Sequence, residues 1–537
     1  MHVKGFSMTF DLIIENGLVI DGTGKAAYPA AVGITDEKIS AIGDLSDSES
    51  QEKIDATGHV ITPGFIDTHC HSDGALLIDG QHAEGVRQGI TTEIIAPDGL
   101  TYAPLNGPDY SMYRQYLSGL LGLPPEDLDM SSISSALENY HHKTAPNVAT
   151  FLGHGPIRIN SVGMEDVALT GKALEHAKSL MAASFEQGAC GFSTGLSYYP
   201  NSFSDSNELV ELCKVAAKHD KVFSIHTRNH NTNRAFFGGG VEEALEIGRR
   251  SGVKVHIEHY RTTANNAGQV ESIMEPIEAA KKDGVDVTLE LYPYPVGSGH
   301  PLAHFPSWFH EGGTTAALRR LEEAETKAML IRDLEDSDSS VLHEYSWTWI
   351  SSQKNRHYEG MSFTDVAEER GTSIEQMICE VVLEEKFSCG VRGVPPQSAR
   401  LWRQVEEDVM TLLDRPDYMV GSDAIPVGGL QHPRAWGTFP RIIGRLRRRH
   451  GYPLEQVIQR VTQNPARRFG LEGRGEIREG FQADICVFDP EMINDLSSFE
   501  DPMIHPIGIP HVLVNGKLVV ENSKCTGTMS GDGIKAV

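Results

Sequence analysis

The feature that most constrains this chain is an apolar segment that ends in a pair of histidines. Residues 60–66 read Val-Ile-Thr-Pro-Gly-Phe-Ile, and His69 and His71 follow within five residues. A turn followed by a continuous apolar run is typical of a strand buried in a parallel sheet. Alternate residues of a strand share a face, so both imidazoles are expected to point the same way and to bind one cation. The competing interpretation is a chance pair in a chain with 23 histidines.

A repeat of helix and strand patterns occupies the middle of the chain. Between residues 205 and 292, helical spacing alternates with apolar runs that end in His226, His259 and Tyr292. Successive members of this set are 33 positions apart, which is about the length of one strand–helix unit. Equal spacing places them at the same level on one rim of a parallel barrel, where the catalytic groups of such barrels lie.

The two ends of the chain have a different pattern from the middle. Short alternating segments punctuated by glycine fill residues 10–60, and similar segments recur after residue 483, including a hairpin with Asn515-Gly516 at its turn. The predicted fold class is therefore α/β. It comprises a TIM-like (β/α)8 barrel over residues 63–471 and a small β-sandwich domain built from residues 8–62 and 472–525. The alternation weakens over residues 297–416, which are expected to form an inserted lid.

Charge and cysteine usage narrow the classes of partner. The formal charge is −27, from 74 acidic and 47 basic residues, and would repel a phosphate backbone, so no nucleic acid is expected. No run approaches the roughly 20 apolar residues of a spanning helix, and no membrane partner is expected.

Seven scattered cysteines without CxxC spacing indicate a cytoplasmic protein. Residues 1–8 lack the apolar core of a signal peptide and are interpreted as a leader. A small-molecule substrate is the expected partner, with the oligomeric state open.

Polar residues at the ends of the predicted strands form one constellation. The set can hold one or two divalent metals, and it consists of His69, His71, Asp98, His154, His226, His259 and Asp423. A metal lowers the pKa of bound water, and Asp423 would take the proton from that water and deliver it to a leaving nitrogen. A helix-capping role is the alternative for Asp423. His154 fits a residue that orients the site as well as it fits a ligand.

Several motifs together resemble the N-acyl-D-amino acid deacylase (D-aminoacylase) family of the amidohydrolase superfamily. They occur in the order typical of that family from about residue 10 to the C-terminus: GFIDTHCHSD at 64–73, Gly153-His154-Gly155-x-x-Arg158, GFSTGLSY at 191–198, Tyr292-Pro293-Tyr294, Gly421-Ser422-Asp423 and HPRAWGTFPR at 432–441. The resemblance implies a zinc-dependent hydrolase that splits N-acyl-D-amino acids into a carboxylate and a free D-amino acid.

The resemblance also implies roles for individual residues. His226 and His259 would hold the tighter metal, His69 and His71 the weaker one, and Asp423 would be the catalytic acid and base. Arg434 matches the arginine that meets the substrate carboxylate, a role suited to the bidentate fork of a guanidinium. Three further positions match substrate contacts, namely Tyr292, Tyr198 and Ser298.

Two positions depart from the family pattern. Ala96-Pro97-Asp98-Gly99 stands where the family has Gly-Asn-Cys-Gly, so a thiolate ligand is replaced by the carboxylate of Asp98. An oxygen ligand leaves manganese, iron and cobalt open beside zinc, which is expected first. Arg261 stands where the family carries lysine and is a further predicted substrate contact. The exchange indicates either a bulkier or more acidic substrate or a neutral replacement of a rim charge.

Two other functions compete with the deacylase interpretation. A cyclic-amide hydrolase of the dihydropyrimidinase or hydantoinase kind typically bridges two metals with a carboxylated lysine on the fourth strand, and residues 191–195 contain no lysine. A non-catalytic binding protein on the same fold would be expected to have lost ligands, whereas all of them are present. Chirality rests on the resemblance alone, and the acyl group and side-chain preference stay open.

Overall fold

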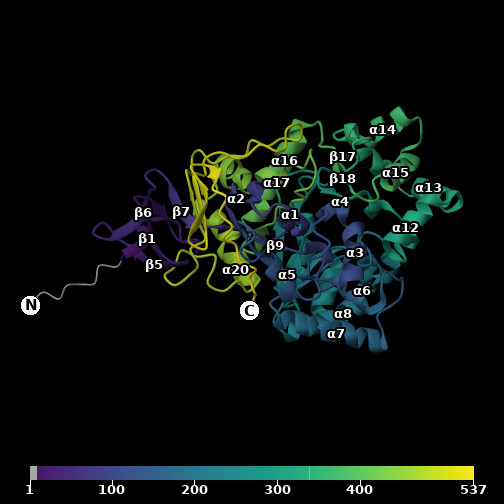
Figure 1. Cartoon of the computed structure of the whole chain (residues 1–537), viewed down its shortest axis with the longest axis horizontal. Helices are drawn as coiled ribbons and strands as arrows, with labels where there is room; N and C mark the ends of the chain where they lie inside the picture. The colour runs from purple at the N-terminus through teal and green to yellow at the C-terminus, as the bar shows by residue number, and fades with distance from the viewer. Residues whose placement is uncertain (1–8, 338) are drawn as a thin grey trace, which may run out of the picture.

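The computed structural model describes residues 9–337 and 339–537, so the predicted leader at Met1–Ser7 lies outside the described residues. Strands from the beginning and the end of the chain lie side by side at one end of the molecule (Figure 1). The helices α12 to α15 lie at the opposite end (Figure 1). The barrel occupies the middle, and it carries the site described below.

In the described residues, eight parallel strand positions form the barrel. They are β8 (Phe65–Asp67), β9 (Ile90–Ile95), β10 (Asn147–Thr150) continued by β11 (Leu152–Gly153), β12 (Gly191–Gly195), β13 (Val222–His226), β14 (Lys254–Ile257), β15 (Val287–Leu291) and β19 (Tyr418–Val420). The ring closes between β19 and β8, where the Thr68 amide donates to the Val420 carbonyl at 3.5 Å. The (β/α)8 prediction is confirmed.

Helices cover the outside of the barrel between successive strands. These are α5 (Ile133–Tyr140), α6 (His154–Val162), α7 (Gly171–Glu186), α8 (Ser206–Lys218), α9 (Gly240–Ser251), α10 (Val270–Lys282), α16 (Ala399–Leu413), α17 (Arg434–Pro440), α19 (Leu454–Val461) and α20 (Gln463–Arg468). Their apolar faces join one continuous core with the strands. Shorter helices follow the first strands: α1 (Asp73–Ile78), α2 (Ala83–Val86), α3 (Gly107–Tyr116) and α4 (Ser118–Leu121). None of the described helices is both long and apolar enough to cross a membrane.

The small β domain takes strands from both ends of the chain. One sheet has the order β5 (Lys38–Gly43), β4 (Ala31–Thr35), β1 (Thr9–Glu15), β6 (Glu49–Asp55). In the other, β20 (Ile485–Phe488) pairs with β7 (Val60–Pro63) on one side and β21 (His511–Val514) on the other, and β22 (Lys517–Glu521), β23 (Lys524–Cys525), β2 (Leu18–Val19) and β3 (Tyr28–Pro29) complete it. Buried aliphatic residues of both segments share one core, including Ile14, Ile61 and Val487.

The chain between β15 and α16 forms a separate layer over the barrel. Its core is an antiparallel sheet of β16 (Ser298–Gly299), β18 (Cys389–Gly393) and β17 (Tyr345–Ile350). The helices of this layer are α11 (Ser307–His310), α12 (Gly313–Glu322), α13 (Ala324–Asp336), α14 (Phe363–Arg370) and α15 (Ile374–Glu384). The predicted insertion at 297–416 also contains α16, which packs beside α10 and β19 as the barrel helix between β15 and β19.

Candidate metal centre

The histidine pair lies immediately after β8 and faces the mouth of the barrel. The sequence pattern had predicted that both histidines lie in the strand. The strand ends at Asp67, so His69 and His71 instead occupy the loop that follows it. The Asp67 carboxylate holds this loop by accepting the amides of His69 at 3.2 Å and Ser422 at 2.8 Å. Nε2 of His69 and Nε2 of His71 are 3.4 Å apart, so the two imidazoles converge as expected.

Asp423 completes a first group of donors with this pair. Its Oδ1 atom lies 3.5 Å from Nε2 of His69 and 3.3 Å from Nε2 of His71. The three residues come from the ends of β8 and β19, which are adjacent in the closed barrel. Asp423 has a positive φ of 53°, which turns its side chain away from the strand direction and into the mouth.

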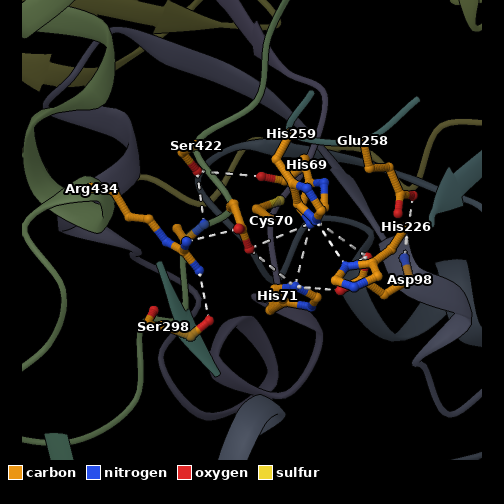
Figure 2. A network of polar contacts seen from close by, with 12 residues as sticks. His69, Cys70, His71, Asp98, His226, Glu258, His259, Ser298, Ser422 and Arg434 are labelled. Atoms are coloured by element: carbon orange, nitrogen blue, oxygen red, sulfur yellow. Dashed lines mark hydrogen bonds and ion pairs between the residues drawn. The ribbon is translucent and has the colours of Figure 1, made fainter. Parts of the chain in front are cut away.

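A second group of donors stands beside the first and is made of His226, His259 and Asp98. Nδ1 of His226 lies 3.0 Å from Nε2 of His259, and Oδ1 of Asp98 is 3.6 Å and 3.9 Å from these nitrogens. Oδ2 of Asp98 reaches Nε2 of His71 at 3.5 Å, so this carboxylate joins the two groups. Figure 2 shows the four imidazoles gathered around a common point with Asp98 at one side.

The donor set fits a bound divalent cation. The ligand atoms of each group lie within 4.8 Å of one another. Among the described residues, Oδ1 of Asp98 is buried and has no hydrogen-bond partner. Burial, and then the charge of His226, lower the pKa of His259 to about 3, so this imidazole stays in the neutral form that ligates metals. Imidazole nitrogens and carboxylates converging in this way match a site for one or two divalent ions.

Three side chains behind the ligands were not found from the sequence. Glu290 accepts a hydrogen bond from Nδ1 of His69 at 2.5 Å, which leaves Nε2 free to face the site. Ser197 accepts from Nε2 of His226 at 3.1 Å and so frees its Nδ1 atom in the same way. Glu258 accepts the Asp98 amide at 3.3 Å, and burial, together with the charge of Asp98, raises the pKa of Glu258. A charged residue inside an apolar strand end was the available signal for both glutamates.

Arg434 lies at the start of α17 and is fully buried beside Asp423. Its Nη1 atom is 2.7 Å from Oδ2 of Asp423, and its Nη2 atom donates to the Ser298 carbonyl at 3.2 Å. Burial raises the pKa of Asp423, but the charges of Arg434 and His69 outweigh it and lower that pKa to about 2. In the part of the chain that the structure describes, Nε of Arg434 is buried and has no hydrogen-bond acceptor. The guanidinium therefore has a donor to offer an anionic ligand.

A cavity of about 490 Å³ opens in front of the two donor groups. It is lined by four of the predicted substrate contacts, namely Tyr198, Tyr292, Ser298 and Arg434. Arg261 is placed differently: its guanidinium stacks on the Tyr292 ring at 4.0 Å, donates to the Thr262 carbonyl at 2.9 Å and is not part of the lining. Residues of the inserted layer, from β16 to Tyr345 and around β18, form the outer wall.

His154 belongs to a different cluster. Both of its ring nitrogens are engaged, Nδ1 with the Thr194 hydroxyl at 2.9 Å and Nε2 with Glu208 at 3.1 Å. Glu208 also accepts two bonds of 2.6 Å from Nη1 of Arg158. This buried cluster joins α6 to α8 on the outside of the barrel, so the structure does not bring His154 together with the other predicted ligands.

Comparison with known proteins gives a consistent set of relatives. A family model described as "Amidohydrolase family" matches residues 391–520. The chain is 33% identical to N-acyl-D-glutamate deacylase of Alcaligenes xylosoxydans xylosoxydans, covering 94% of this chain and 93% of that protein. The crystal structure of N-acyl-D-glutamate deacylase from Bordetella bronchiseptica, with zinc and a phosphonate mimic of the tetrahedral intermediate, matches with a TM-score of 0.79 at 27% identity, covering 98% of this chain and all of that one. A D-aminoacylase structure reported for its binuclear metal centre matches at 0.76 and 29% identity, over 97% and 99% of the two chains.

Proposed function

The chain belongs to the N-acyl-D-amino acid deacylase family of metal-dependent amidohydrolases, and we propose that the barrel site hydrolyses the amide bond of N-acyl-D-amino acids. The products are a carboxylate and a free D-amino acid. The observation that carries this proposal is the placement of a buried carboxylate between metal donors and an arginine: Oδ1 of Asp423 faces His69 and His71, while Oδ2 is held by Arg434.

The cofactor is one or two divalent metal ions, as in the related structures with zinc and with a binuclear centre. We propose that His226, His259 and Asp98 hold one ion and that His69 and His71 hold the other, with Asp98 shared between them. A divalent cation bound there polarises the amide carbonyl and lowers the pKa of the attacking water. The protein contributes the fixed directions of these ligands, through Glu290 behind His69 and Ser197 behind His226.

Asp423 is proposed to move the proton during the reaction. Its low pKa keeps it ionised at neutral pH, so it accepts a proton from the attacking water at Oδ1. The same carboxylic acid then donates that proton to the nitrogen of the departing amino acid. Arg434 fixes the orientation of Asp423 by holding Oδ2 at 2.7 Å.

Arg434 is also proposed to bind the α-carboxylate of the substrate. The Nε atom, which lacks an acceptor among the described residues, supplies a donor for it, and the fully buried position strengthens the interaction. The guanidinium also contacts the aromatic ring of Tyr292, with the Arg434 Cζ atom 4.8 Å from the ring centre. Tyr198 and Ser298 are proposed to contact the same ligand, because both line the cavity and the Ser298 hydroxyl has no partner in the described residues.

We also propose that the protein works in the cytoplasm on a small molecule and binds no nucleic acid. The support for a reducing compartment is that all seven cysteines are free, and six of them are buried. The support against nucleic acid is the net charge of −27.

Replacing Asp423 tests the proposed proton transfer. Asp423→Asn keeps the size of the side chain but removes its basic oxygen, so release of D-amino acid from an N-acetyl-D-amino acid is expected to fall by about 10²–10⁴-fold. Metal content is measured on the same samples. Loss of activity with metal retained supports the role, whereas near-normal activity would contradict it. Loss of metal together with activity would instead assign Asp423 to metal binding.

A further inference from the structure

The side-chain preference of the enzyme can be argued from the charges that line the cavity, provided that the proposed function holds. Among the described lining residues, Arg434 is the one arginine or lysine. The remaining charged side chains of the lining are carboxylates: Asp98 and Asp423 at the metal centre and Glu344 near the mouth. Apart from the metal, the cavity thus offers one fixed positive charge, and an N-acyl-D-amino acid always brings one carboxylate of its own to meet it.

Three histidines of the lining do not supply a second positive charge at neutral pH. They are His230, His300 and His304, and none of them belongs to the two donor groups. Burial, and then the neighbouring histidines, lower the pKa of His300 to about 3 and that of His304 to about 4. The pKa of His230 is lowered by burial and by His226. Crowding of the three rings opposes protonation of each one.

His300 is equipped for an uncharged hydrogen-bonding group. Only 4% of the residue is exposed, and neither ring nitrogen has a hydrogen-bond partner among the described residues. A neutral imidazole has one donor and one acceptor, so it matches an amide or a hydroxyl better than a carboxylate, which only accepts. The ring lies beside Tyr198, with 5.9 Å between the ring centres.

Arg261 is the remaining candidate for a second cation near the cavity, but its side chain contacts Tyr292 and Thr262 and does not line the cavity. The Cζ atom of its guanidinium lies 4.0 Å from the centre of the Tyr292 ring, and Nη1 donates to the Thr262 carbonyl. Tyr292 itself lines the cavity, and Arg261 does not. Its charge thus faces an aromatic ring and a backbone oxygen next to the site, and its Nε atom has no hydrogen-bond partner among the described residues.

From these contacts we infer that the enzyme prefers N-acyl-D-amino acids with an uncharged side chain over those with an acidic one. A glutamate or aspartate side chain would bring a second carboxylate into a cavity whose fixed cation is already engaged. Near the mouth this carboxylate would meet Glu344. Elsewhere it would meet uncharged walls, made of valines such as Val391 and of polar residues such as Asn229 and Asn265. Burying an unpaired carboxylate is costly, whereas an amide or an aliphatic chain is accepted without such a penalty.

The test is a pair of nearly isosteric substrates on the metal-loaded enzyme. N-acetyl-D-glutamine and N-acetyl-D-glutamate differ in one charge and hardly in size, and N-acetyl-D-methionine serves as an apolar reference. The kcat/KM for glutamine is expected to exceed that for glutamate by about tenfold or more. In Glu344→Gln the ratio of kcat/KM for glutamine to kcat/KM for glutamate should fall by about two- to fivefold, as expected for removing one exposed repulsive charge. Glu52→Gln makes the same exchange on β6, far from the cavity, and should leave the ratio unchanged.

Two results would overturn the inference, and they are distinguishable. If glutamate is hydrolysed as well as glutamine or better, the cavity has a second cation, and loss of the glutamate activity alone in Arg261→Met would identify Arg261 as its source. If none of the three D-substrates is hydrolysed by enzyme that retains its metal, the proposed deacylase function itself fails.

Discussion

At the scale of a single residue, we propose that Asp98 sets the chemistry of the metal centre. It is buried, its Oδ1 atom faces His226 and His259, and its Oδ2 atom faces His71. A left-handed backbone at Asp98, with φ of 57°, aims the carboxylate across the barrel mouth from the end of β9. A carboxylate is a harder ligand than the thiolate that the resembled family carries here, so it favours oxygen-preferring metals more strongly.

Exchange of this oxygen for sulfur is expected to change metal selectivity. Asp98→Cys should raise the affinity for zinc relative to manganese by about tenfold or more, because thiolates bind the softer ion more strongly. The relative affinity is measured by exposing each variant to both metals and determining the bound zinc and manganese by elemental analysis. This measurement does not depend on activity. Asp98→Asn, which removes the charge, should weaken the binding of both metals. An unchanged zinc-to-manganese ratio in the cysteine variant would show that Asp98 is not a ligand.

At the scale of elements, the cluster of Arg158, Glu208 and His154 joins two helices outside the barrel. Asp205 caps α8 by accepting the Glu208 amide at 2.8 Å, and the Glu208 side chain turns inward to Arg158 on α6. Burial raises the pKa of Glu208, but His154 and Arg158 outweigh it and lower the pKa from 4.5 to about 2. A carboxyl whose pKa is lower in the folded state stabilises the fold above its unfolded pKa and loses that contribution as the pH falls toward the folded value.

The cluster predicts a pH-dependent stability difference. Glu208→Gln leaves Arg158 without its buried partner, so the free energy of unfolding at pH 7 is expected to drop by about 3 kcal/mol. The difference in the free energy of unfolding between this variant and the unmodified protein should shrink as the pH falls from 4.5 toward 2. Urea unfolding followed by fluorescence at several pH values measures it. Glu211→Gln, on the exposed face of the same helix, is the matched control with little expected effect. Equal effects of the two exchanges would refute the structural role of the cluster.

Strand ends and their spacing made much of this architecture predictable. The interval of 33 residues that separates His226, His259 and Tyr292 reflects the length of one barrel unit, and the three strands lie next to one another as expected. Glu290 and Glu258 were not predicted, because periodicity assigns strand residues to the core and does not reveal which polar residue inside a strand turns toward a ligand. The position of Arg261 could not be predicted either, because stacking on Tyr292 depends on how two neighbouring loops meet.

At the scale of the whole molecule, the site depends on segments that are far apart in the sequence. The donors come from the ends of five barrel strands, while the outer wall of the cavity comes from the layer inserted after β15. The strands of the small domain bring the two ends of the chain together through β7 and β20. After the last strand, the chain returns to the barrel, where the Ile534 amide donates to Val148 and the Val537 amide donates to Gly470. Hydantoinase structures share this architecture at 16% identity, which shows the fold alone.

This barrel is a metal-dependent deacylase of N-acyl-D-amino acids, and that function can be tested directly. The most direct measurement is the release of free amino acid from N-acetyl-D-methionine and N-acetyl-L-methionine, on enzyme stripped of metal and then reloaded with zinc, manganese or cobalt. We expect no release by the stripped enzyme, recovery with at least one metal, and hydrolysis of the D-form only. Hydrolysis of neither form, or of the L-form only, by the metal-loaded enzyme would refute the deacylase function.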